Sequence, residues 1–155
     1  MIISSDSMMQ RFGEMVGARL VGGEVFELVG DVGAGKTTFV RGLAKGLGVS
    51  EQVQSPTFTI SREYHCRDDL RLVHYDFYRL NEAGLMADEL AESIGDKKSI
   101  VVIEWSGVAS DQLPVGRIAI EILPVPGDES AREVRVSASG VLESIVKEVF
   151  DVLAN

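Results

Sequence analysis

An eight-residue motif near the N-terminus constrains the fold of this chain more than any other feature. The segment Gly30–Thr37 reads GDVGAGKT and fits the pattern G-x-x-x-x-G-K-[ST] in full. A short run rich in Val, Phe and Leu precedes it at 24–29, and apolar residues at helical spacing follow it over 36–46. The motif therefore has the strand–loop–helix context of a P-loop, which predicts a fold built to bind nucleotide phosphates.

Each residue type in this motif has a physical role. Gly30, Gly33 and Gly35 permit backbone angles that residues with a Cβ resist, so successive N–H groups can converge on phosphate oxygens. The helix that begins near Lys36 directs the positive end of its dipole to the same anion. We expect Lys36 to reach the β- and γ-phosphates and the Thr37 hydroxyl to bind Mg²⁺. A glycine-rich turn without a ligand would leave Lys36 and the three glycines unexplained together.

The rest of the chain alternates predicted helices and strands. Helical spacing covers 6–20, 81–94 (interrupted at Gly84) and 141–153, and strand-like runs cover 58–65, 70–78, 100–103, 117–123 and 133–138. The runs 58–65 and 70–78 predict an antiparallel hairpin. The order predicts an α/β P-loop NTPase three-layer sandwich, with a mixed, mostly parallel central sheet, the inserted hairpin, and helices on both faces. The length predicts a single domain, 1–155.

Composition excludes several classes of protein. The chain has 24 Asp and Glu against 15 Lys and Arg, a formal charge of −9, which argues against DNA binding or any broad grip on nucleic acid. A lone cysteine, Cys66, excludes an intrachain disulfide and a zinc cluster. The N-terminus lacks the apolar core of a signal peptide, and the apolar run 100–103 is far short of the ~20 residues that span a bilayer. We therefore expect a cytoplasmic protein without membrane association.

A second acidic feature follows a predicted buried strand. The continuous β-branched run Ile100–Ile103 is typical of a strand buried on both faces, and Glu104 follows it directly. Ligands bind at the carboxyl ends of parallel strands, so we expect Glu104 beside the phosphate loop. There it would hold Mg²⁺, directly or through water, or orient the attacking water. For Trp105, simple packing competes with a contact to the nucleotide or to a partner.

Two further segments carry polar side chains. The segment Ser55–Thr59 reads SPTFT, and a hydroxyl there would join the Mg²⁺ shell as in a switch loop, or form an ordinary Ser/Thr turn. Strand alternation along HYDFYR puts His74, Asp76 and Tyr78 on one face, which indicates either a site or a structural His–Asp contact. Arg79 would neutralise phosphate charge or form a surface ion pair.

Taken together, these segments resemble the TsaE (YjeE) family of bacterial P-loop ATPases. The family's markers stand here as GDVGAGKTTF, SPTFTI, HYDFYRL and VVIEW, in the family's order and spacing, and the resemblance extends from the first helix to the strand near Arg135. Each marker alone occurs in other proteins, whereas the set is specific. The resemblance implies an ATPase needed to make N6-threonylcarbamoyladenosine (t6A) in tRNA, beside the anticodon. It also implies that TsaD and TsaB, which form the transferase complex, are the partners, and that tRNA is reached only through them.

The resemblance further implies roles for individual residues. The positions that would contact the nucleotide phosphates are Asp31, Gly33, Ala34, Gly35, Lys36, Thr37 and Thr38. Thr37 and Glu104 would hold Mg²⁺, and Asp76 would be an acid that supports hydrolysis together with Lys36 and Glu104. Thr57 would belong to a switch loop.

Contacts to the base and the second switch depart from the family's pattern. Arg132 aligns with a basic residue near the adenine, and Met9 stands where many members have a threonine close to the base. Trp105 would lie beside the site, but Ser106 and Gly107 follow it where many members have proline.

Three alternative functions follow from the same motifs. A GTPase usually reads guanine with N-K-x-D, and neither Asn81 nor Asn155 begins such a motif. A small-molecule P-loop kinase usually has an arginine-rich lid, whereas the arginines here are scattered. A nucleotide-binding adaptor without turnover stays open. Because the sequence has no obvious arginine finger in cis, it predicts hydrolysis stimulated by a partner.

Overall fold

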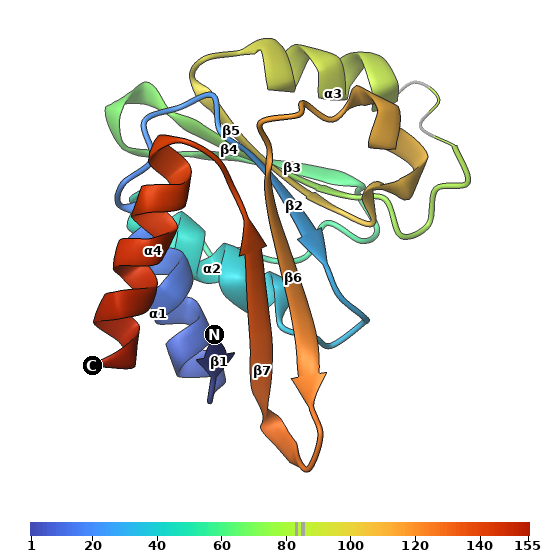
Figure 1. Ribbon diagram of the computed structural model, residues 1–155. Coiled ribbons are helices and arrows are strands. Elements are labelled where there is room, and N and C mark those ends of the chain that lie inside the picture. The colour runs from blue at the N-terminus through green and yellow to red at the C-terminus, as the bar shows by residue number, and fades with distance from the viewer. Residues whose placement is uncertain (83, 85) are drawn as a thin grey trace.

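The computed structural model describes residues 1–155 except 83 and 85. Within that part of the chain, seven strands form one sheet in the order β1-β7-β6-β2-β5-β4-β3 (Figure 1). The strands are β1 (Ile2–Ile3), β2 (Val25–Val29), β3 (Ser61–His65), β4 (Arg71–Asp76), β5 (Ser99–Glu104), β6 (Ile118–Val125) and β7 (Asp128–Ser137). The α-helices are α1 (Asp6–Gly17), α2 (Lys36–Gly46), α3 (Met86–Gly95) and α4 (Val141–Ala154), and the 3₁₀ segments are η1 (Arg67–Asp69) and η2 (Ser106–Gln112).

The central strands of the sheet are parallel and the outer strands are antiparallel. Strand β5 pairs in parallel with β4 and β2, and β2 pairs in parallel with β6. The hairpins β3–β4 and β6–β7 and the short β1–β7 pair are antiparallel. This confirms the predicted mixed, mostly parallel sheet with its inserted hairpin. The registers Leu28↔Glu104 and Asp76↔Glu104 bring the ends of β2, β4 and β5 to the edge where the P-loop begins.

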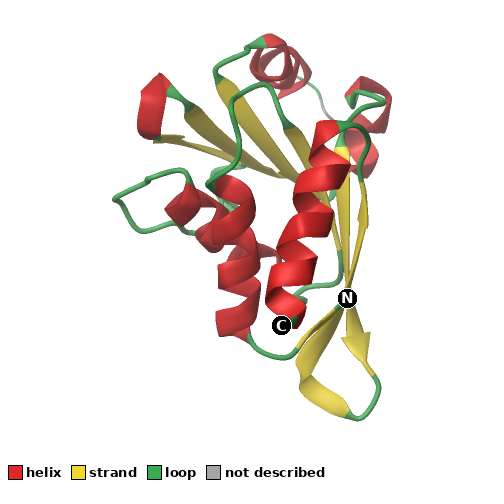
Figure 2. Cartoon of the chain, turned by 60° about the vertical axis from the view of Figure 1, so that its left-hand side comes forward, coloured by secondary structure: helices red, strands yellow, loops and turns green. Residues whose placement is uncertain are grey.

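Strand alternation divides the core into two layers, one on each face of the sheet. On β5, Ile100 and Val102 pack in the layer that contains the buried faces of α1, α2 and α4. Val101 and Ile103 belong to the other layer, with Leu90 of α3 and residues of η2. Helices therefore cover both faces, as the sequence predicts (Figures 1 and 2).

Helices α1 and α2 cross with their backbones in contact. A Cβ at Gly13 would lie 2.3 Å from a backbone oxygen of α2, and a Cβ at Gly42 would lie 2.1 Å from a backbone oxygen of α1. Gly17 and Gly46, one turn further along each helix, are equally close to the opposite backbone. We call these four residues the glycine seam. The missing side chains allow an approach that any other residue would prevent.

We expect Gly42→Ala to lower the free energy of unfolding by about 1–3 kcal/mol, because the added methyl collides with the α1 backbone. This loss is expected although alanine favours helices by about 1 kcal/mol over glycine. Gly95→Ala is the matched control, because outside its own stretch of helix no described atom lies within 4 Å of a Cβ there. Urea unfolding followed by circular dichroism measures both variants, and equal midpoints would contradict the seam's role.

The first strand of the inserted hairpin is shorter than predicted. The sequence predicts a strand over 58–65, but the structure begins it at Ser61. The N–H of Ile60 donates to the carbonyl of Pro56 at 2.6 Å, and φ of Ile60 is +69°. The preceding residues therefore form a turn, because their N–H groups bond locally rather than across the sheet.

Other elements also differ from the sequence prediction: the strand predicted over 133–138 begins at Asp128, and the helix predicted over 6–20 ends at Gly17. The helix predicted over 81–94 begins at Met86, and residues 83 and 85 of that range lie outside the described residues. Strand β1 is only two residues long, too short for a period-2 pattern, and is fixed by its pairing with β7. Among the helices described, none has the length and apolar character required to cross a membrane.

Candidate functional site

A cleft of about 360 Å³ lies at the carboxyl edge of the sheet, in front of the P-loop. Its walls come from the N-terminus of α1, the P-loop, the loop before β3, the ends of β4 and β5, and β7. The lining residues are Asp6, the loop residues 32–38, Ser55, Thr57, Asp76, Tyr78, Glu104, Trp105 and Arg132. Most of the residues singled out in the sequence thus surround one cleft.

The P-loop has an open, uncapped end that suits an anion. Gly33 and Gly35 have φ of +79° and +110°, the left-handed region in which glycine is favoured. Gly35 is the N-cap residue of α2, and no side chain caps this helix. The first N–H groups of α2 consequently stay available, and the helix dipole adds a positive potential at the same point.

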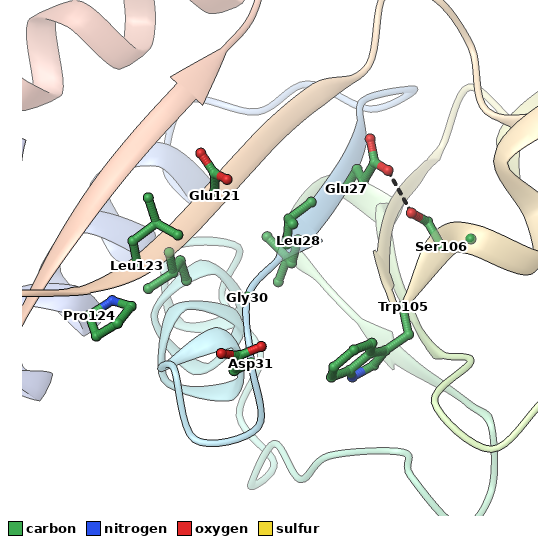
Figure 3. Close-up of a pocket in the computed structure, with 12 residues that line it drawn as sticks. Glu27, Leu28, Gly30, Asp31, Trp105, Ser106, Glu121, Leu123 and Pro124 are labelled. Carbon is green, nitrogen blue, oxygen red and sulfur yellow. Dashed lines mark hydrogen bonds between the residues drawn. The ribbon is translucent and has the colours of Figure 1, made fainter.

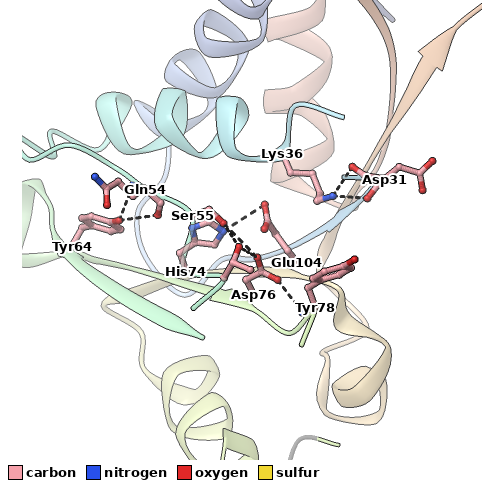
Figure 4. A network of polar contacts seen from close by, with 11 residues as sticks. Asp31, Lys36, Gln54, Ser55, Tyr64, His74, Asp76, Tyr78 and Glu104 are labelled. Atoms are coloured by element: carbon pink, nitrogen blue, oxygen red, sulfur yellow. Dashed lines mark hydrogen bonds and ion pairs between the residues drawn. The ribbon is translucent and has the colours of Figure 1, made fainter. Parts of the chain in front are cut away.

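Lys36 bends back over the loop that precedes it (Figure 4). Its ammonium donates to the carbonyls of Gly30 and Asp31, the latter at 2.9 Å, and lies 4.7 Å from the centroid of the Trp105 ring. The pKa of Lys36 lies below its ordinary value, because burial disfavours the ammonium more than nearby carboxylates, Glu104 foremost, favour it. The charge is partly desolvated, which strengthens its attraction to an anion.

Asp76 and Glu104 form a pair of buried carboxylates on adjacent strands. Asp76 is 4% exposed and Glu104 is 2% exposed, and the β4–β5 register places the two residues opposite each other. Asp76 accepts hydrogen bonds from the Thr57 hydroxyl at 2.9 Å, the Ser55 hydroxyl at 3.4 Å and the backbone N–H of Tyr78 at 2.9 Å. Asp76 therefore fixes the loop that carries Thr57 against the end of β4 (Figure 4).

Glu104 retains an oxygen without a hydrogen bond. Among the described residues, Oε1 of Glu104 and both ring nitrogens of His74 are buried and have no hydrogen-bond partner, and Nε2 of His74 is 3.7 Å from that oxygen. A buried, unpaired carboxylate oxygen beside a second carboxylate is costly unless a cation neutralises it. Glu104 and the Thr37 hydroxyl are hard oxygen ligands of the kind that Mg²⁺ binds together with phosphates, so they fit that ion.

The protein ligands at this point are too few to hold a metal ion by themselves. Across the described ranges, 1–82, 84 and 86–155, no group of three or more His, Cys, Asp and Glu side chains is arranged to hold a metal. Phosphate oxygens and water would therefore have to complete the Mg²⁺ shell, as is usual for this ion.

Trp105 forms one wall of the cleft in a strained conformation. Its φ of +56° is in the left-handed region, which costs a non-glycine residue about 1–3 kcal/mol. The ring packs on Tyr78, with the two centroids 4.9 Å apart, and stands over the Lys36 ammonium. Packing on both sides holds the strained backbone in place.

The residues predicted near the base have different surroundings. Arg132 lines the cleft, and its Nε donates to the carbonyl of Ala34 at 3.0 Å. Met9 is only 2% exposed and lies in the core below Gly35, so its side chain is not among those that line the cleft. Asp6, three residues earlier on α1, lines the cleft instead. No motif of the sequence distinguishes Asp6, and the N-cap of α1 is Ser5, whose hydroxyl accepts from the N–H of Met8.

Arg79 lies away from the cleft lining. Its guanidinium carbon is 4.4 Å from the centroid of the exposed Phe58 ring, which is a cation–π contact. This geometry matches neither role that the sequence suggests for Arg79, phosphate neutralisation or a surface ion pair.

Comparison with known proteins gives a consistent result. The family model described as Threonylcarbamoyl adenosine biosynthesis protein TsaE matches residues 3–134. The tRNA threonylcarbamoyladenosine biosynthesis protein TsaE of Bacillus subtilis is 42% identical over 120 residues, which cover 76% of this chain and 72% of that protein. Its namesake in Streptomyces coelicolor is 37% identical over 137 residues, which cover 87% of this chain and 92% of that protein. The crystal structure of Bacillus subtilis YdiB matches with a TM-score of 0.77 and 30% identity, over 98% of this chain and 93% of that one.

Proposed function

The chain belongs to the TsaE family, and on that premise we propose that it binds and hydrolyses ATP with Mg²⁺ to support t6A formation in tRNA. The observation that carries this proposal is the position of the buried Asp76–Glu104 pair beside an intact P-loop. A P-loop is sufficient for a site that only holds a nucleotide. Two buried carboxylates next to it are the groups that hydrolysis of a phosphoanhydride would use.

In the proposed reaction, Lys36 and the N–H groups at the start of α2 bind the β- and γ-phosphates. Thr37 and Glu104 would hold Mg²⁺, which would neutralise charge that develops on the phosphates. Asp76 holds the Thr57 hydroxyl in the lining of the cleft, where it would sense whether a γ-phosphate is present. The alternative role for Glu104 is to orient the attacking water.

We propose the TsaD–TsaB transferase complex as the partner, in the cytoplasm, with tRNA contacted only through that complex. Arg132 is the one arginine among the described lining residues of the cleft, and its guanidinium donates to carbonyls of the P-loop and of β7 itself. Lys36 is thus the main cation at the phosphates within the chain, and additional charge from a partner would accelerate hydrolysis.

The test of this proposal is ATP turnover with and without the cognate TsaD–TsaB complex. We expect weak turnover alone and strong stimulation by the complex. Hydrolysis that the complex leaves unchanged, or normal t6A levels in cells that lack this protein, would refute the proposal.

Asp76→Ala should lower stimulated turnover by about 10- to 100-fold, because the bond that holds the Thr57 hydroxyl is lost and one charge-assisted hydrogen bond contributes about 1.5–3 kcal/mol. ATP affinity should change much less, because Asp76 contacts the switch loop rather than the P-loop. Single-turnover kinetics and equilibrium binding separate these effects. Asp151→Ala, an exposed acid on α4, is the control. Full turnover by Asp76→Ala would remove the assigned role.

A further inference from the structure

A second hollow lies beside the nucleotide cleft, and we call it the flank groove. It has a volume of about 420 Å³ and lies between the end of β2, the start of η2 and the second half of β6. Figure 3 shows Trp105 and Ser106 on one side of it and Glu121, Leu123 and Pro124 of β6 on the other. The groove opens at the same edge of the sheet as the cleft.

The flank groove and the cleft share a wall. Trp105 lines both spaces, in its strained conformation. Gly30 and Asp31 also line the groove, and their carbonyl oxygens are the ones that accept hydrogen bonds from the Lys36 ammonium. Anything seated in the groove would therefore touch the ring and the backbone that position the P-loop lysine.

The lining of the groove combines an apolar surface with carboxylates. Leu123, Pro124 and Val29 line it, and Val29 is 43% exposed although it is a large apolar residue in a strand. Exposed apolar surface of this kind marks sites of protein contact when it is grouped with other apolar groups.

The carboxylates of the groove differ in how far they are already neutralised. Glu27 accepts hydrogen bonds from Arg117 and Ser106, which hold its pKa below the ordinary value although burial acts to raise it. Within the described part of the chain, the one charged partner of the Glu121 carboxylate is Arg135 at 3.8 Å, a looser contact than the hydrogen bonds of Glu27.

Asp31 completes the acidic side of the groove. Its carboxylate is exposed and makes no hydrogen bond or ion pair with any residue that the structure describes. Glu121 and Asp31 thus present two incompletely neutralised negative charges on either side of an apolar surface. This combination complements a protein segment with a basic side chain and repels a nucleic-acid backbone.

We infer that the flank groove is the docking surface for a segment of the partner protein that carries an arginine or lysine between Glu121 and Asp31, against Trp105. The inference rests on the proposed function and specifies where its partner acts. A cation seated there stands next to the P-loop, whose own cleft lining is short of cations. The docked segment would contact the shared wall, which also positions Lys36. Docking of the segment would therefore change the position of Lys36, which is how the bound partner would stimulate hydrolysis.

The charge reversal Glu121→Lys tests the basic chemistry of the partner segment. With the purified TsaD–TsaB complex as the probe, we expect the half-saturating concentration for stimulation to rise at least about 10-fold. ATP–Mg²⁺ affinity and turnover without the complex should stay unchanged. Asp151→Lys makes the same change of charge on α4, behind the opposite face of the sheet, and should be stimulated like the unaltered chain.

Leu123→Asp tests the apolar surface, with Val115→Asp as its control. Val115 is fully exposed and precedes β6 at the far end of that strand. We expect Leu123→Asp to lose stimulation and direct binding of the complex, and Val115→Asp to keep both. Full stimulation of both groove variants would overturn the inference. If Leu123→Asp loses stimulation while Glu121→Lys keeps it, the inference that the partner segment carries a basic side chain is wrong.

Two further results would overturn the inference in distinguishable ways. Light scattering that finds a dimer of this chain, dissolved by Leu123→Asp, would assign the groove to a second copy. A TsaD–TsaB complex that neither binds nor stimulates the unaltered chain would refute the proposed partner itself. If the complex binds and stimulates both the unaltered chain and the groove variants, the proposed function is supported. The inference that the flank groove is the docking surface is then refuted.

Discussion

Lys36→Ala is expected to abolish tight binding of ATP–Mg²⁺. Lys36 is buried, its ammonium lies above the Trp105 ring, and its hydrogen-bond acceptors among the described residues are two backbone carbonyls, so an incoming phosphate meets a partly desolvated charge. Hydrogen bonds that involve a charged group contribute about 1.5–3 kcal/mol each. Two such bonds to the phosphates correspond to a loss of at least about 100-fold in affinity.

The only tryptophan of the chain provides the measurement. Trp105 lies 4.7 Å from the Lys36 ammonium and lines the cleft, so its fluorescence should change when nucleotide binds. Lys45→Ala is the matched control, because Lys45 lies on the same helix, is exposed, and pairs with Glu14 at 2.9 Å. An exposed ion pair of this kind contributes at most about 1 kcal/mol. If Lys36→Ala and Lys45→Ala bind ATP–Mg²⁺ with equal nanomolar or micromolar affinity, the role of Lys36 is ruled out.

Glu104→Ala is expected to reduce turnover by about 100- to 1,000-fold, the range seen when one group that stabilises developing charge is removed. ATP affinity should fall far less, because the P-loop N–H groups and Lys36 still bind the phosphates. Glu104 is buried at the end of β5, and one of its oxygens has no hydrogen-bond partner among the described residues, so an ion or water in the cleft can use it. Single-turnover hydrolysis at saturating ATP measures the chemical step directly.

Glu104→Gln separates the charge of this residue from its volume. Glutamine fills nearly the same space, so a loss of turnover as large as that of Glu104→Ala would show that the negative charge is needed. The dependence on Mg²⁺ should also shift to higher concentration in both variants. Glu143→Gln, an exposed acid on α4, serves as the control. Turnover close to that of the unaltered chain in Glu104→Gln would contradict the role of the charge.

The sequence predicts the centre of the fold well because local patterns determine it. The motif at Gly30–Thr37 sets a strand before it and a helix after it, and the β-branched run 100–103 is buried on both faces as expected. The ends of the sheet depend on contacts between distant segments. Strand β1 exists only because β7 lies beside it, and Ile60 leaves the strand pattern because its N–H bonds to Pro56.

The same distinction applies to the cleft. Asp76, Glu104 and Trp105 stand at the ends of predicted strands, so the rule for parallel sheets places them correctly at one edge. Asp6 and the flank groove are products of the way helices and β6 pack around that edge, and neither has a pattern in the sequence. Met9 has the spacing of a core residue, and its burial follows that spacing rather than its alignment.

The glycine seam joins the two helices that form one wall of the nucleotide cleft, and we expect this wall to be rigid. Helix α1 carries Asp6 and helix α2 begins at the P-loop, so both helices end at the cleft while their backbones touch further along. Neither helix can slide or rotate without forcing main-chain atoms into each other. We therefore expect any closing motion around a nucleotide to come from the opposite side. There the Thr57 hydroxyl is held by hydrogen bonds to Asp76 and Ser55, and the Trp105 ring is held by packing on Tyr78. In such a motion the seam would keep the start of α2, and with it the N–H groups that bind phosphate, in place while the opposite side of the cleft moves.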